Sequence, residues 1–528
     1  MIRVVRASLV VLACLSLPVE ALAAPPEPLV DADEPPTDQP PAPVIPEHDF
    51  RRPVDHEIAE SSTRDTVDRG EVLALAEVLD SVSDHDPRLA AADHDIERSK
   101  GNVLSARGGF DTSLSFLQIY EPLYKSATTR VRVEQATPFY GLTAWAGWQI
   151  GVSGMPGVTP VWDPGSAGRL MSAEGGELFA GATLPLVRDG WTDRRRSDVE
   201  QSKLERERVG YFRDATQLAL EAEAATAYWN WVAAGMQLEI EQQLLDLALV
   251  RNTKLTRQIE LGAVDRLAGI DNKRVMLDRE GRIVLAERTF QGAALALSLY
   301  LRDEAGNPVV AGADRLPRDL PTMPSPLGYD LDAEIAGAID QRPDRRAQLR
   351  SREQSDVELR WAKNQRTPRV DLSAWTSHEI GRHPFLDAGE TTPLRTELFT
   401  SIFVEIPIPM REARGRIQSA EASLDIVGSE LRMLDNQIGV EVADAHLAVD
   451  AAYQRALLAG QQVELTEELA QAELRRFELG EGDLLLVNLR ELAIADAASA
   501  EVSAVAEYFI AKAHLEVARG EGVAPVAP

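Results

Sequence analysis

Histidines and acidic side chains are the residues of this 528-residue chain that could hold a metal ion or carry out acid–base catalysis. The eight histidines are scattered, and no two have the i, i+4 spacing with a glutamate that places zinc ligands and a base on one helix face. His446 falls inside a long helical pattern, so we interpret it as a packed or solvated side chain. Adjacent acids such as Glu467 and Glu468 are interpreted as a solvated helix face.

Motifs for nucleotide binding and for nucleophilic catalysis are also missing. The sequence contains no G-x-S-x-G elbow, no phosphate-binding P-loop and no glycine pattern of a dinucleotide-binding fold. Acidic residues outnumber basic ones, 84 to 55, which gives a formal net charge of −29 and disfavours nucleic acid as a partner. We therefore expect a protein that is not an enzyme and that uses no cofactor and no metal ion.

The N-terminus has the features of an export signal. Arg3 and Arg6 precede an apolar run, and Ala21–Ala23 supplies the small residues that a signal peptidase requires. We predict a signal peptide over residues 1–23, because the run is too short for a permanent membrane helix and no long apolar stretch follows. The only cysteine, Cys14, lies in this run within the sequence VLAC, and a lipidated cysteine stays open as the alternative.

The remaining chain reads as two similar halves. HDPRLAAADHDIERSKGNVLSARGGFDTSLSF, from His85, matches QRPDRRAQLRSREQSDVELRWAKNQRTPRVDLSA, from Gln341. The predicted division is a disordered lead-in rich in proline and acid, a first repeat, a second repeat and a disordered tail, over residues 24–69, 70–325, 326–520 and 521–528.

Each half ends in two long helical segments that are separated by a glycine turn. The turns fall at Gly262 and Gly480, where a glycine can adopt the positive φ that a tight reversal requires. From Arg411 to Glu478 there is no proline, and roughly 68 residues at about 1.5 Å each predict a helix about 100 Å long. We therefore expect an antiparallel helical hairpin in each half, with tips near 262 and 480.

Alternating apolar and polar residues predict strands before each helical pair. In LRTELFTSIFVEIPIPM, Leu398, Ile402 and Val404 oppose Glu397 and Ser401, and RVDLSAWTSHEI, FDTSLSFLQIY and GLTAWAGWQIGVSG alternate in the same way. A soluble sheet with one buried face and a membrane barrel share this period. The export signal and the aromatic residues near strand ends favour the barrel. These aromatic residues are Phe139, Tyr140, Trp145 and Trp148.

The first half is longer than the second by about 38 residues. Pro343 follows its counterpart Pro87 by 256 positions, whereas Gly480 follows Gly262 by only 218. The surplus falls in the strand region, and we interpret it as an inserted hairpin with a long loop over Ser153–Gly168.

Taken in order, these landmarks resemble the TolC-type outer-membrane channel family, the exit ducts of bacterial efflux pumps and type I secretion systems. The resemblance covers about residues 71–520. DPRL and RPDRR open the two halves, and LPLVRDGWTDRRRSDVEQSKLE and IPIPMREARGRIQSAEASL resemble the passages from strand to helix. RRFELGEGDLLLVNLRELAIA resembles a helix-turn-helix tip of this family.

The resemblance implies a mixed α+β fold. In a homotrimer, each chain would lend four strands to one outer-membrane β-barrel, continued by a long periplasmic α-helical barrel of coiled-coil hairpins from the two internal repeats. It further implies a passive exit duct, surrounded by outer-membrane lipid, that opens when a periplasmic adaptor (membrane fusion) protein and an inner-membrane transporter engage it. The alternative is a periplasmic coiled-coil adaptor or scaffold without a pore; such adaptors carry one hairpin flanked by compact β modules.

The resemblance also places the working residues at the helical tips. The expected adaptor-contacting residues are Leu261, Gly262, Ala263, Leu479, Gly480 and Glu481. Family members often carry carboxylates just after the second tip, but here Leu486 and Leu489 occupy the inward positions, where rings of leucine could gate by dewetting. The expected residues of a periplasmic gate are Asp271, Asp483, Leu486, Leu489 and Glu491.

Overall fold

The computed structural model describes residues 72–122, 126–153, 175–262, 264–325, 328–381, 396–479 and 481–525. All of them belong to the unit that spans 65–528. The predicted signal peptide, the predicted lead-in, residues 154–168 of the predicted loop, Ala263 and Gly480 lie outside the described residues.

Helices make up most of the described chain. Those before residue 325 are α2 (Leu75–His85), α3 (Pro87–Arg107), α4 (Arg194–Glu260) and α5 (Arg266–Leu297). Those after it are α6 (Leu331–Gln341), α7 (Pro343–Gln365), α8 (Arg411–Glu478) and α9 (Leu484–Ala518). Helix α8 has 68 residues and coincides with the proline-free stretch, so the prediction of this long helix is confirmed.

Proline and aspartate mark where several of these helices begin. Pro87 and Pro343 stand at the first position of α3 and α7, where a missing N–H and a fixed φ fit the helix. The side chain of Asp86 accepts a hydrogen bond from the backbone N–H of Arg88 at 2.8 Å, and Asp193 does the same for the N–H of Arg196. Each cap satisfies a donor that the first turn of the helix leaves unpaired.

Six antiparallel strands form one sheet, in the order in which they occur along the chain. They are β1 (Ser113–Glu121), β2 (Ser126–Ala136), β3 (Thr143–Ser153), β4 (Glu177–Pro185), β5 (Arg369–Glu379) and β6 (Thr396–Glu405). The sheet therefore has two strands more than the four that the resemblance implies for each chain. The hairpin β2–β3 supplies them, so the expected inserted hairpin is present and holds most of the surplus residues of the first half of the chain.

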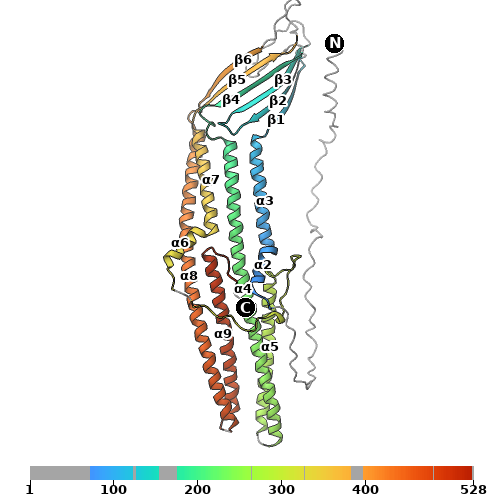
Figure 1. Ribbon diagram of the computed structural model, residues 1–528, viewed down its shortest axis with the longest axis vertical. Coiled ribbons are helices and arrows are strands. Elements are labelled where there is room, and N and C mark those ends of the chain that lie inside the picture. The colour runs from blue at the N-terminus through green and yellow to red at the C-terminus, as the bar shows by residue number, and fades with distance from the viewer. Residues whose placement is uncertain are drawn as a thin grey trace, which may run out of the picture. The chain divides into compact units, whose positions relative to one another are not determined.

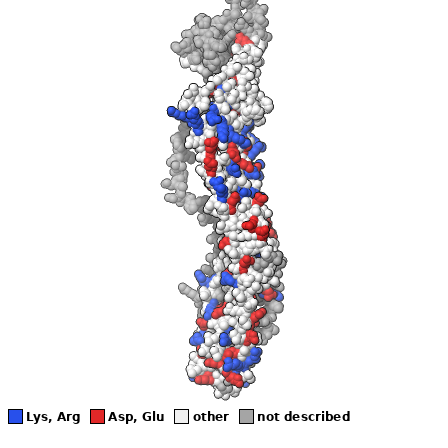
Figure 2. All heavy atoms as spheres, turned by 90° about the vertical axis from the view of Figure 1, so that its left-hand side faces the viewer, with Lys and Arg blue, Asp and Glu red and all other residues white. Residues whose placement is uncertain are grey.

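The strands have the predicted apolar face, but the alternation is incomplete, because Leu117 and Ile119 of β1 and Phe403 of β6 stand exposed on the opposite face. Apolar side chains on one face of the edge strands are largely open to solvent in the single chain, with Leu114 at 73%, Leu398 at 76% and Ile402 at 69% exposure. Figure 2 shows mostly uncharged atoms over the strands and a dense mixture of charged side chains over the helices on the face that it draws. The sheet thus has an unusually apolar surface for a chain whose net charge is −29.

The long helices pair as the glycine turns predict. Helix α4 packs against α5, α8 packs against α9, and α4 also packs against α9, so two hairpins meet along their length (Figure 1). The order of short helices, strands and a long helical pair occurs twice along the chain. The internal duplication itself stays a prediction. Within the described residues, no helix combines the length and apolar character needed to cross a membrane.

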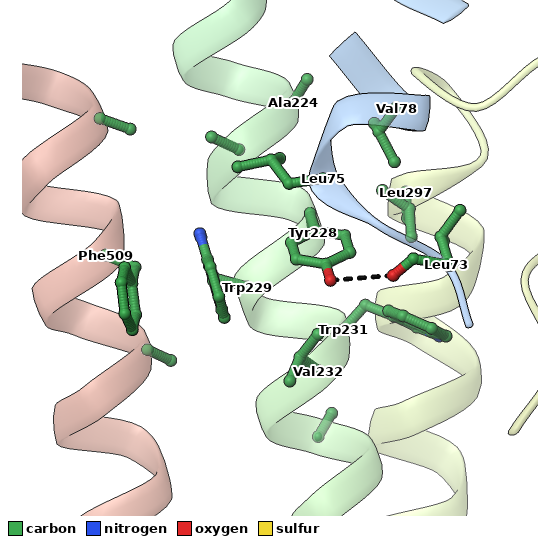
Figure 3. Close-up of a cluster of buried hydrophobic side chains, with 14 of the residues drawn as sticks. Leu73, Leu75, Val78, Ala224, Tyr228, Trp229, Trp231, Val232, Leu297 and Phe509 are labelled. Atoms are coloured by element: carbon green, nitrogen blue, oxygen red, sulfur yellow. Dashed lines mark hydrogen bonds between the residues drawn. The ribbon is translucent and has the colours of Figure 1, made fainter. Parts of the chain in front are cut away.

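The main hydrophobic core lies where α2, α4, α5 and α9 meet (Figure 3). Trp231 is fully buried there, and the ring of Trp229 stacks on that of Phe509 of α9 at 4.4 Å between centroids. The Tyr228 hydroxyl donates a hydrogen bond to the carbonyl oxygen of Leu73 at 2.9 Å. This core fixes the two hairpins to each other at one level.

Candidate functional site: the helical tips and the ion network behind them

The first tip is a short reversal between α4 and α5. Gly262 has a φ of 73°, which confirms the predicted positive φ, and its N–H donates to the carbonyl oxygen of Ile259 at 3.0 Å. A side chain at this position would meet no atom within 4 Å, so the need for glycine comes from the backbone rather than from packing. Leu261 beside it is 75% exposed, so an apolar side chain stands open at the tip.

Replacing Gly262 by alanine is therefore expected to strain this tip by about 1 kcal/mol, because a left-handed conformation is unfavourable for a residue with a Cβ. Limited trypsin digestion at Arg257 and Arg266 should become several-fold faster. Gly281→Ala is the matched control, since Gly281 lies inside α5 with open space around it and alanine should favour the helix there. Equal digestion rates for the two variants would contradict the assigned role of Gly262.

The second tip contains a glycine that the sequence did not single out. The backbone N–H of Glu481 donates to the carbonyl oxygen of Arg476 at 2.9 Å, and a Cβ at Gly482 would lie 2.7 Å from the backbone nitrogen of Phe477. Gly482 therefore allows a close approach of the chain to the end of α8. Leu479 is 76% exposed and Glu481 is exposed as well, so this tip also presents a bare leucine.

Aspartates cap the helix that leaves each tip. The side chain of Asp265 accepts from the N–H of Leu267 at 3.3 Å, and that of Asp483 accepts from the N–H of Leu485 at 3.1 Å. Asp483, one of the expected gate residues, thus starts α9. Asp271, another of them, lies on α5 within 3.1 Å of Arg274, one helical turn along the same helix. Each of these carboxylates is therefore engaged within its own hairpin.

The first turns of α9 carry several leucines that point away from the chain. Leu486 is 41% exposed and Leu489 is 53% exposed, whereas Leu484 and Val487 are buried against the neighbouring helices. The two leucines expected at the gate therefore lie on the open side of α9.

Glu491 behaves differently from the other expected gate residues. Its carboxylate accepts hydrogen bonds from Arg251 of α4 and, at 2.9 Å, from Arg279 of α5. The three side chains are only 13%, 12% and 4% exposed, in that order. Arg251 also donates to the amide oxygen of Asn488 at 2.6 Å, and Arg279 donates to the carbonyl oxygen of Leu244. One acid of the second hairpin thus links both helices of the first.

Burial lowers the pKa of both arginines of this network. Burial and the nearby charge of Arg279 lower the pKa of Arg251 to about 10, and burial lowers the pKa of Arg279 below its usual value. Both guanidiniums still hold their protons near pH 7. Two buried cations face one carboxylate, so the network depends on Glu491 more than on either arginine.

Two buried asparagines extend the polar layer. Asn272 of α5 is fully buried, and its side-chain amide donates to the carbonyl oxygen of Ala248 at 3.4 Å. The amide oxygen of Asn272 and the amide nitrogen of Asn488 have no hydrogen-bond partner in the single chain. Together with Glu491, Arg251 and Arg279, these asparagines form a polar layer between the apolar core and the tips.

Sequence reasoning pointed to Glu491 but missed Arg251 and Arg279. A charged residue inside a long helical pattern reads as solvated, and nothing in the local spacing shows that two of these arginines face a distant acid. Other expectations about charged and polar residues hold: His446 is packed, with its ring stacked on Tyr329, and Glu467 and Glu468 are exposed. No group of three potential metal ligands occurs among the described residues.

Comparison with known proteins supports a fold but gives no sequence family. No protein-family model matches the chain, and no curated protein sequence matches it. Among solved structures, the outer-membrane channel OprN matches with a TM-score of 0.59 and 18% identity, over 86% of this chain and 94% of the other. The CmeC outer membrane channel of Campylobacter jejuni matches with a TM-score of 0.57 and 14% identity, over 85% and 86% of the two chains.

A third channel agrees with these two. The MtrE outer membrane channel of Neisseria gonorrhoeae, solved in an open state, matches with a TM-score of 0.58 and 17% identity, over 85% of this chain and 89% of the other. The matches span nearly the whole of each channel chain, so the strands and both hairpins are included. The chain therefore has the fold of the TolC-type outer-membrane channels.

Proposed function

We propose that the protein is a passive exit duct in the outer membrane of a bacterial envelope, serving a tripartite efflux pump or a type I secretion system. The observation that carries this proposal is the combination of a sheet whose apolar face is exposed with two long helical hairpins that continue from its strands. Lipid would cover the apolar face, and the hairpins would extend into the periplasm. A scaffold without a pore has no use for such a sheet.

One open sheet of six strands cannot enclose a lumen, so several copies are needed, and the family resemblance implies a homotrimer. A periplasmic adaptor would bind the exposed tips, where Leu261 and Leu479 offer bare apolar side chains. An inner-membrane transporter would supply the energy, since the sequence carries no nucleotide-binding motif. The cargo would be selected upstream, by the transporter.

Opening would require the two hairpins to part near their tips. The network of Glu491, Arg251 and Arg279 holds them together at this level, so we assign it as the tie of the closed state. Such a tie makes closure a two-state equilibrium that adaptor binding at the tips can shift. The exposed Leu486 and Leu489 would add a dewetting barrier where copies of α9 approach each other.

Fractionation and single-channel recording test the duct. The protein should enter the outer-membrane fraction, require detergent for extraction and run as a heat-resistant trimer. In planar bilayers, it should give discrete conductance steps. A soluble monomer without conductance would support the adaptor or scaffold alternative and would contradict the duct.

A further inference from the structure

We propose that each subunit contributes all six strands to the barrel wall, and that the free edges of β1 and β6 pair with neighbouring copies of this chain. The inference deepens the proposed function, on which it rests. It assigns the hairpin β2–β3 to the wall, whereas the family resemblance led us to expect four wall strands and a surplus outside them.

Hydrogen-bonded pairing joins the hairpin to the sheet on both sides. Strand β2 pairs with β1 from Ser113–Glu134 to Glu121–Ser126, and β3 pairs with β4 from Thr143–Thr183 to Gln149–Glu177. The hairpin therefore lies within the sheet along almost its whole length. An appendage on a four-stranded wall would instead leave β1 free to pair with β4.

On the polar face of the sheet, side-chain contacts join the two strands of the hairpin to each other and to β4. Arg130 of β2 donates to the side-chain oxygen of Gln149 of β3 at 2.9 Å, and Gln149 donates to the carboxylate of Glu177 of β4 at 2.8 Å. Phe179 of β4 is only 5% exposed because its ring lies over Gly147 of β3, where a Cβ would come within 2.5 Å of it. A glycine that makes room for a ring on the next strand is a device that fixes strand pairing.

The hairpin also follows the face pattern of the other strands. Val131 and Trp148 stand in one cross-strand row with Phe116 of β1 and Leu178 of β4, on the apolar face. Their neighbours along the strands include Arg130, which points to the opposite face. A hairpin outside the wall would have no reason to keep this alternation, so the pattern indicates lipid on one side and the lumen on the other.

The two edges of the sheet fit each other. Among the described strands, β1 pairs only with β2, and β6 pairs only with β5. The strand number is even, so β1 and β6 run antiparallel, and a copy rotated about the barrel axis brings its β1 antiparallel to β6. The edge strands have nearly equal lengths, nine and ten residues, and both carry exposed apolar side chains on the same face. A second copy of this chain is therefore the partner that completes each edge.

Disulfide trapping tests the arrangement, since the only native cysteine is Cys14, in the predicted signal peptide. The variants join Phe116→Cys on β1 with one cysteine on the apolar face of β6. The β6 positions are Leu398, Thr400, Ile402 and Val404. At least one pair should link subunits into covalent dimers and trimers on oxidation. Phe116→Cys with Val131→Cys is the positive control, because these residues are register partners within one chain.

The decisive comparison is Phe116→Cys with Leu178→Cys. These positions share a row but have β2 and β3 between them, so no disulfide should form, and spin labels there should lie about 15 Å apart, three strand spacings. Efficient cross-linking of this pair within an intact trimer, or an intact trimer in which no β6 position links to Phe116→Cys, would overturn the six-stranded wall and leave the duct standing. A soluble monomer would remove both proposals.

Discussion

Replacement of Glu491 by alanine is expected to produce the largest change in channel behaviour. The variant leaves Arg251 and Arg279 buried without their shared carboxylate, and breaking a buried pair in this way costs roughly 3–5 kcal/mol. This cost destabilises the closed state relative to any state in which the arginines contact water. Separation of the two hairpins would expose the arginines to water in this way. Open probability in planar bilayers should therefore rise by at least tenfold.

The matched control for this variant is Glu507→Ala. Glu507 lies on the same helix and also pairs with an arginine, Arg455, but both side chains are well exposed, and such surface pairs contribute about 0–1 kcal/mol. Its conductance should resemble that of the unaltered protein. If Glu491→Ala and Glu507→Ala gave the same open probability, the network would not be the tie of the closed state.

A triple variant separates charge from packing. Changing Arg251 and Arg279 to methionine and Glu491 to leucine replaces the network with apolar side chains of similar length, which is often neutral or stabilising at buried sites. The hairpins should then stay together without any charge. We expect this variant to close at least as well as the unaltered protein, in contrast to Glu491→Ala.

Replacement of Trp231 by alanine is expected to cause the largest loss of stability. The side chain is fully buried between α2, α4 and α5, and truncation of a buried tryptophan removes about 3–5 kcal/mol through lost contacts and the cavity left behind. Guanidinium unfolding followed by the helical circular dichroism signal should show the shift. Trp191→Ala is the control, because Trp191 is 80% exposed and its loss should change stability by less than about 0.5 kcal/mol. Similar losses in the two variants would contradict the position of the core.

The long helices could be predicted from the sequence because their limits are set locally. The proline-free stretch from Arg411 to Glu478 coincides with α8, and the positive φ of Gly262 follows from the tight turn. In the second tip, the sequence analysis placed the turn at Gly480 and did not single out Gly482, two positions further on. Gly482 has no room for a side chain because the backbone of Phe477 lies close to it. That close approach is set by the fold and cannot be read from the local sequence.

The strand count could not be settled from pattern alone. Both strands of the inserted hairpin alternate as barrel strands do. The expectation of four wall strands nevertheless left the surplus residues to an extra hairpin or a long external loop. Two contacts become visible only when β3 and β4 lie side by side. Gln149 donates a hydrogen bond to Glu177, and the ring of Phe179 packs over Gly147. Likewise, Glu491 and Arg251 are far apart along the chain, and helical periodicity does not show which turns of two long helices meet.

Cryo-electron microscopy of the full-length protein, extracted in detergent from outer membranes, tests the central claim most directly. The account predicts threefold symmetry, a continuous lumen through sheet and helices, and a constriction where the tips converge near Glu491. A particle with a single chain and solid packing along the helices, without a lumen, would contradict it.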